Sequence, residues 1–107
     1  MSKYSIYIYT YDTTTASYSI SATYNYNLQK NIVDFLNNPH NYFSTFKGLD
    51  QVVVTDNYTN TVLYIVDTLQ HKYYFNVSGV LHRTLEVFIS KQTRQLSKHG
   101  YTFSNDL

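Results

Sequence analysis

The chain has 107 residues, which is the size of one domain and enough to bury a hydrophobic core without disulfides or metal. It contains no cysteine, so disulfides, thiolate zinc sites, iron–sulfur clusters and thiol catalysis are excluded. Its net charge is only +1, which makes whole-molecule attraction to nucleic acid or anionic lipid weak. We therefore treat residues 1–107 as a single domain and predict neither a cofactor nor a metal.

The first two predicted elements are strands. Residues 4–11 alternate and have high β-propensity, so one face carries Tyr4, Ile6 and Ile8. The other face carries Tyr7, Tyr9 and Tyr11. Residues 17–26 also alternate, which predicts one packed face and one wet face. The packed face consists of Tyr18, Ile20, Ala22, Tyr24 and Tyr26. A turn at residues 12–16 makes the two strands a hairpin.

A short amphipathic helix follows the hairpin. Asn27 is predicted to be its N-cap, and apolar residues recur at helical spacing from Leu28 to Leu36. The helix ends before Pro39, because the residue preceding a proline avoids the helical region. The loop from residue 40 to residue 48 is predicted to be anchored to the core by its aromatic rings, namely Tyr42, Phe43 and Phe46.

Three more strands and a long helix complete the chain. The strands are predicted at residues 51–55, 62–67 and 72–77, with connections short enough for antiparallel neighbours. Beyond Ser78-Gly79, one face of a helix is formed by Leu81, Leu85, Phe88, Ile89, Gln92 and Leu96. Gly100 is placed to end this helix in the left-handed conformation. Tyr101 and Phe103 then fold back onto the core or add a short edge strand.

The order ββαβββα predicts the α+β class. We expect an antiparallel sheet of about five strands, with two amphipathic helices packed mainly on one face. The N-terminus lacks the apolar core of a signal peptide, and no apolar run approaches the length of a membrane span. The sequence therefore predicts an intracellular protein that does not cross a membrane.

The sequence shows no pattern typical of a catalytic site. The four histidines are scattered, the three glycines stand alone, and the only glutamate lies on the polar face of the last helix. Four aspartates fall at predicted strand ends, where turns commonly use them. We predict a non-enzymatic protein with no catalytic residue. The Asn- and Tyr-rich, charge-poor composition is interpreted as that of a viral or phage accessory protein in the host cytoplasm.

Several predicted strands carry large apolar side chains on both faces, whereas only two helices are available to cover them. The uncovered side chains on this interpretation are Tyr7, Tyr9, Tyr11 and Tyr74. Three explanations compete: cover from elsewhere in the chain, a homodimer or protein partner, and a stacking platform for single-stranded nucleic acid. We favour the protein interface, because tyrosine is enriched at interfaces and few cations are expected beside these rings.

The last predicted helix is basic, with Glu86 as its only acidic residue. Its cations are Arg83, Lys91, Arg94 and Lys98. They are interpreted either as a solvated outer face with cations near the helix C-terminus or as a phosphate-binding helix. Nucleic-acid binding is therefore the alternative function. A small-molecule pocket between the sheet and the long helix, lined with phenols, is a third possibility.

Overall fold

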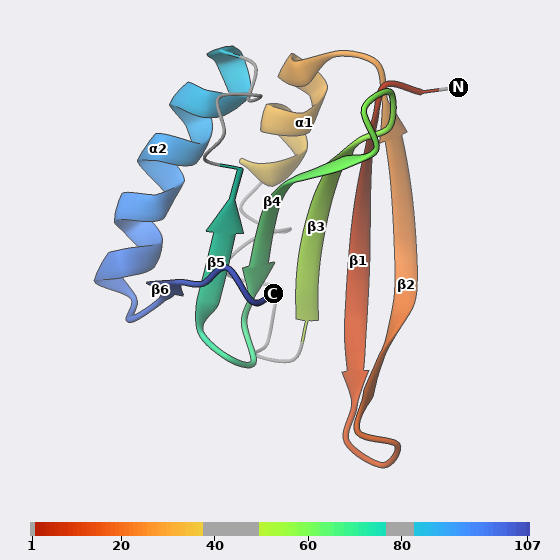
Figure 1. The fold of residues 1–107 in the computed structure, drawn as a ribbon, viewed down its shortest axis with the longest axis vertical. Helices are drawn as coiled ribbons and strands as arrows, with labels where there is room; N and C mark the ends of the chain where they lie inside the picture. Colours follow the sequence, from red (N-terminus) through yellow and green to blue (C-terminus); the bar gives the residue numbers. More distant parts are fainter. Residues whose placement is uncertain (1, 38–49, 77–82) are drawn as a thin grey trace.

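The fold is that of a computed structural model, in which residues 2–37, 50–76 and 83–107 are described. These residues form one six-stranded sheet and two helices (Figure 1). The elements are β1 (Tyr4–Asp12), β2 (Ser17–Tyr26), α1 (Gln29–Leu36), β3 (Asp50–Asp56), β4 (Thr61–Asp67), β5 (Lys72–Phe75), α2 (Arg83–Lys98) and β6 (Thr102–Phe103). The strand order is β2-β1-β3-β4-β5-β6. All neighbouring pairs are antiparallel except β5 and β6, which are parallel.

The predicted α+β class is confirmed, but the sheet has six strands rather than five. The sixth strand forms because Gly100 follows the end of α2 and turns the chain, with a φ of 84° that is the left-handed conformation expected from the sequence. The Tyr101 backbone N–H donates to the Leu96 carbonyl at 2.9 Å, which closes the helix end. The Thr102 N–H then donates to the His71 carbonyl at 3.0 Å, and β6 pairs with β5.

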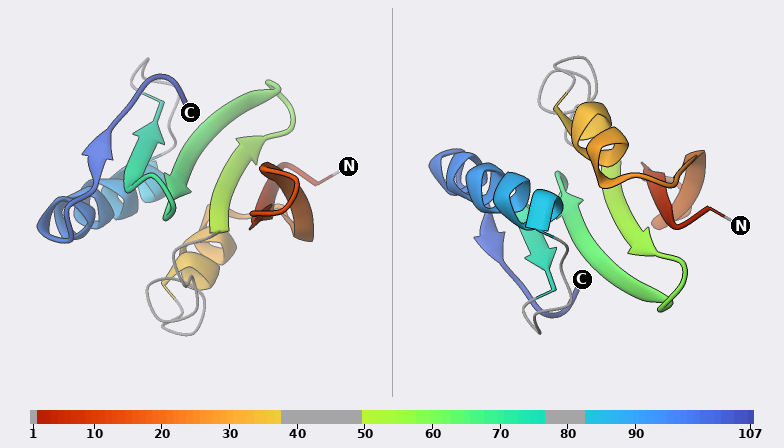
Figure 2. Two further views of the ribbon diagram at one scale, coloured as in Figure 1. Left: turned by 90° about the horizontal axis from the view of Figure 1, so that it is seen from below. Right: turned by 90° about the horizontal axis from the view of Figure 1, so that it is seen from above.

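Both helices lie on the same side of the sheet (Figure 2). The predicted core face of α2 is confirmed at the described positions, where Leu85, Phe88, Ile89 and Leu96 are buried. Ile32 and Leu36 of α1 are buried beside them. Tyr4 and Ile6 of β1 are fully buried under the helices, and Ile8 packs against the same core. One apolar core therefore fills the space between the helix layer and the sheet.

Some sequence predictions lie outside the described residues. The aromatic anchors Tyr42, Phe43 and Phe46 belong to residues 38–49, and so does the proline that was expected to end α1. Val77 and the predicted helix start at Ser78-Gly79, with Leu81, belong to residues 77–82. These expectations stay predictions.

The predicted N-cap of α1 is wrong. The N-cap is Leu28, whose φ of −117° and ψ of 137° are extended, and no side chain caps this helix. The Asn27 Oδ1 accepts instead the backbone N–H of Lys3 at 3.1 Å. The hairpin brings Lys3 within reach of Asn27, so the asparagine joins the start of β1 to the chain that follows β2.

The three hairpin turns have a similar hydrogen-bonding pattern and backbone conformation. Each begins with an aspartate whose Oδ1 accepts a backbone N–H two or three residues later, at distances between 2.8 and 3.2 Å. These aspartates are Asp12, Asp56 and Asp67. The fourth residue after each aspartate has a positive φ, and these residues are Ala16, Asn60 and His71. The expectation that strand-end aspartates serve turns is confirmed at these three positions.

A β-bulge in β2 corrects the predicted faces of that strand. Ala22 pairs with Ile8 but Ile20 pairs with Tyr9, so Ser21 is an extra residue in β2. The alternation of side chains is therefore interrupted, and Tyr18 and Ile20 lie on the side of the sheet away from the helices. The prediction that they share a face with the later residues of β2 is wrong.

The two remaining tyrosines of β2, Tyr24 and Tyr26, lie on the helix side of the sheet and are packed, as predicted. The ring centroids of Tyr24 and Tyr26 lie 4.7 and 6.4 Å from that of Phe35 in α1. Each half of β2 therefore supplies aromatic rings to a different surface of the sheet.

Candidate functional site

The helix-free side of the sheet carries a continuous row of large side chains. Strand register places Tyr7 beside Val53, Val53 beside Ile65, and Ile65 beside Tyr74. The bulge brings Tyr18 and Ile20 to the same side. We call this surface the tyrosine face, formed by Tyr7, Tyr9, Tyr11, Tyr18, Ile20 and Tyr74. All four residues predicted as an interface belong to it, and the two that sequence reasoning missed come from the bulged strand.

Most of the tyrosine face is partly accessible to solvent. The tyrosines are half-buried, whereas Ile20 is 54% exposed. The ring centroids of Tyr7 and Tyr9 are 6.5 Å apart, and those of Tyr11 and Tyr18 are 5.1 Å apart. These contacts make the aromatic surface continuous along β1. Neither described helix lies over this side of the sheet (Figure 2).

Tyr74 differs from the other members of the tyrosine face because its ring packs against the C-terminal strand. Its ring stacks on Phe103 of β6, with centroids 6.0 Å apart and an interplanar angle of 29°. The C-terminal end of the chain lies on the same side of the sheet, close to β4 and β5 (Figures 1 and 2). The tyrosine face is therefore most open over β1 and β2 and more crowded over β5.

A buried aspartate, Asp67, is hydrogen-bonded to the tyrosine face. The Asp67 side chain is completely inaccessible to solvent. Its Oδ2 accepts hydrogen bonds from the Tyr18 hydroxyl at 2.8 Å and from the Gln51 amide at 3.1 Å. Gln70 donates its backbone N–H to Oδ1 at 2.8 Å and its side-chain amide to Oδ2 at 3.3 Å. Four donors from β2, β3 and the β4–β5 turn thus converge on one carboxylate.

Asp67 was predicted only to serve a turn, and no local pattern distinguishes it from Asp12 or Asp56. Burial of two neighbouring phenols, together with their interactions with Asp67, raises their pKa values. Burial, followed by the hydrogen bond to Asp67, raises the pKa of Tyr18 to about 12. Burial, followed by the charge of Asp67, also raises the pKa of Tyr101. Both phenols are therefore held in the neutral, hydrogen-bonding form well above neutral pH.

The cations of α2 lie on a different surface from the tyrosines. Arg83, Lys91 and Arg94 line a shallow hollow of about 320 Å³ on the exposed side of the helix. Glu86 and Ser90 line it as well. Lys98 lies in the last turn and does not line the hollow. The structure therefore brings together three of the four cations that the sequence singled out, on the opposite side of the sheet from the aromatic rings.

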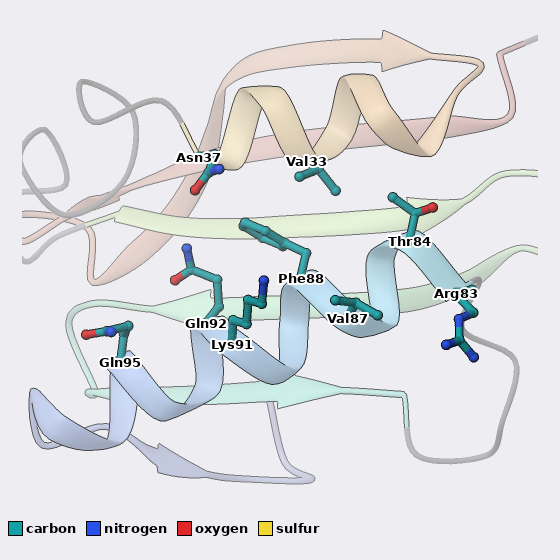
Figure 3. Close-up of a pocket in the computed structure, with 9 residues that line it drawn as sticks. All are labelled: Val33, Asn37, Arg83, Thr84, Val87, Phe88, Lys91, Gln92 and Gln95. Carbon is teal, nitrogen blue, oxygen red and sulfur yellow. The ribbon is translucent and has the colours of Figure 1, made fainter.

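A groove of about 590 Å³ separates α1 from α2 (Figure 3). Phe88 and Val33 are apolar residues of its lining, and Lys91 and Arg83 come from the α2 side. The Gln92 Oε1 is buried and has no hydrogen-bond partner among the described residues. The groove lies between the two helices, and no tyrosine of the described residues lines it. It is therefore not the phenol-lined pocket between the sheet and the long helix that the sequence suggested, and that pocket stays a prediction.

Over the described ranges, no group of three or more metal-binding side chains comes together. Neither described helix is both long enough and apolar enough to span a bilayer. The side chains brought together on the tyrosine face can pack and donate hydrogen bonds to a partner, and those of the α2 hollow can bind anions. No protein-family model, curated protein or solved structure was found to match this chain.

Proposed function

We propose that this chain is a non-enzymatic interaction protein that binds another protein, or a second copy of itself, through the tyrosine face. The observation that carries the proposal is the accessible aromatic row on the helix-free side of the sheet. An apolar patch of this kind is rarely left wet on a monomer. Phenol rings suit an interface because the ring supplies contact area while the hydroxyl keeps a hydrogen bond at a wet rim.

The rigidity of the underlying sheet supports the same proposal. Val53 and Ile65 are buried between the rings, and Asp67 fixes the Tyr18 hydroxyl. Side chains that are already held in place lose little conformational entropy on binding. A viral or phage accessory role fits such a small binding protein and stays part of the proposal.

The test is site-specific photocrosslinking in cells of the native source. A photoreactive aromatic amino acid at position 9 should give an adduct with one defined protein, whose identity mass spectrometry would establish. The same amino acid at Tyr58, a turn residue that is 62% exposed and outside the tyrosine face, is the matched control and should give no such adduct. An adduct with a second copy of the chain would assign self-association to the face.

Tyr9→Asp should then reduce recovery of that partner by at least about 10-fold, because an unpaired charge would be desolvated at the interface. Tyr58→Asp should leave recovery unchanged. Circular dichroism should show that both variants are folded. Equal crosslinking from positions 9 and 58, or none from position 9, would contradict the proposed function.

Nucleic-acid binding by α2 is the second candidate, favoured by the hollow that Arg83, Lys91 and Arg94 line. The double variant Arg83→Ala and Arg94→Ala should reduce the salt slope of oligonucleotide affinity by about 2, because each lost phosphate contact removes about one unit. Lys30→Ala, which removes an exposed lysine of α1, is the control and should keep the wild-type slope. A wild-type protein that fails to bind an oligonucleotide column at low salt would rule this candidate out.

A further inference from the structure

The edge strand β2 is long and open. Among the described strands it pairs only with β1, and it forms one border of the sheet (Figure 1). It has ten residues, none of them charged, proline or glycine. The opposite border is β6, which has two residues. Proteins normally protect long edges with charges, prolines or bulges, because the free backbone groups pair readily with another chain. In β2 the bulge at Ser21 is the only such protection, so the backbone groups of residues 22–26 that point away from β1 can pair with another chain.

One hydrogen bond and the registers of two strand pairs determine which backbone groups of β2 point outward. The Asn57 N–H donates to the Lys3 carbonyl at 2.7 Å, at the start of the β1–β3 ladder. Because bonding alternates along an antiparallel ladder, the odd-numbered residues of β1 up to Tyr9 bond to β3, and the even-numbered ones bond to β2. The even-numbered residues pair with Tyr26, Tyr24 and Ala22. Thr23 and Asn25 therefore direct their N–H and C=O groups away from the sheet.

Exposed apolar side chains lie along the same border. Ile20 is 54% exposed, Tyr24 is 40% exposed and Leu28, directly after the strand, is 60% exposed. Ile20 and Leu28 are equally far from Tyr24 in sequence. A second β2 running antiparallel and centred on Tyr24 would place the Ile20 end of one strand beside the Leu28 end of the other. Because of the bulge, Ile20 lies on the helix-free side of the border and Tyr24 on the helix side. The border therefore has exposed apolar residues at both ends, and no residue of β2 carries a charge that would repel its own copy.

We propose that two copies of this chain associate by antiparallel pairing of their β2 strands about a two-fold axis at Tyr24. Thr23 of each copy exchanges hydrogen bonds with Asn25 of the second copy, giving about four N–H···O bonds. The six-stranded sheets then form one continuous sheet with two tyrosine faces side by side. This inference goes beyond the proposed function, because it uses the edge of the sheet and assigns it a specific partner.

The first experiment is light scattering of the purified full chain between about 10 µM and about 500 µM. The mass should rise towards twice 12.6 kDa. Thr23→Pro removes one outward N–H from each copy and should weaken dimerisation about 30-fold. Thr23→Val changes the same side chain but keeps the N–H, so it is the matched control and should dimerise as the wild type does. Tyr9→Asp should also remain dimeric.

A second measurement needs no variant and so does not depend on the proline variant folding. Amide hydrogen exchange by NMR should show Thr23 and Asn25 protected at high concentration and at least about 10-fold faster after dilution. Tyr24, whose N–H points to β1, should stay protected at both concentrations. A protein that is monomeric throughout, or amides that exchange equally at all concentrations, would overturn the edge pairing. A dimer that Tyr9→Asp abolishes and Thr23→Pro preserves would assign self-association to the tyrosine face instead.

Discussion

Asp67→Ala is expected to lower the free energy of unfolding by about 4 kcal/mol, the largest loss from any single substitution considered for this protein. The carboxylate is fully buried and accepts bonds from Tyr18, Gln51 and Gln70. Alanine would leave these donors without an acceptor and open a cavity at the same time. Urea unfolding followed by circular dichroism measures the loss, and the melting temperature should fall by about 20 °C.

Two further variants separate the role of Asp67 from a general effect of removing a carboxylate. Asp67→Asn keeps the shape and one acceptor oxygen, so it should lose about 2 kcal/mol. Asp106→Ala removes an exposed carboxylate near the C-terminus and should change stability by less than about 0.5 kcal/mol. A loss of less than about 1 kcal/mol for Asp67→Ala would show that the converging donors find other partners.

The second large effect expected is a loss of stability at alkaline pH. The folded-state pKa of Tyr18 is about 12, above the ordinary value of 10.0, so the folded protein holds this proton more tightly than the unfolded chain does. The stabilisation is complete below about pH 10 and disappears as the pH rises towards about 12. The raised pKa values of Tyr4 and Tyr101 act in the same direction. Urea unfolding at a series of pH values would measure the decline.

Tyr18→Phe tests the origin of this decline. Phenylalanine loses the bond to Asp67, so it should cost about 1.5 kcal/mol at neutral pH and then decline less steeply than the wild type above pH 10. Tyr58→Phe, in an exposed turn, is the matched control at neutral pH and should change stability by less than about 0.5 kcal/mol. Parallel alkaline profiles for Tyr18→Phe and the wild type would mean that other groups cause the decline.

The sequence was sufficient where one local rule acted alone. The spacing of Leu85, Phe88, Ile89 and Leu96 predicted the buried face of α2, because a helix on one side of a sheet has one apolar stripe. Gly100 predicted the helix end for the same kind of reason, since only the left-handed conformation was needed there. The two faces of β1 were also predicted, because no bulge interrupts the alternation of this strand against β3.

The sequence was insufficient where the outcome depended on a second strand. The alternation of β2 continues across Ser21 without a break, so only the register against β1 reveals the extra residue that turns Tyr18 and Ile20 to the other face. The sequence around Asp67 does not distinguish it from other turn aspartates, because its donors Tyr18 and Gln51 come from distant parts of the chain. Asn27 does not cap α1, because the hairpin places its side chain beside the Lys3 N–H, from which it accepts a hydrogen bond.

The strand order also has a kinetic consequence. Three of the strand pairs are hairpins closed by tight aspartate turns, and such local units form within about 10 µs. The β1–β3 pair is different, because Thr10 pairs with Asp50, which lies forty residues further along the chain. Closing that long loop lowers the conformational entropy of the chain before any favourable contact between β1 and β3 has formed. We therefore expect the joining of the β1–β2 hairpin to the β3–β4–β5 unit to be the slow step of folding, and until it is complete the edges of β1 and β3 are open to mispairing.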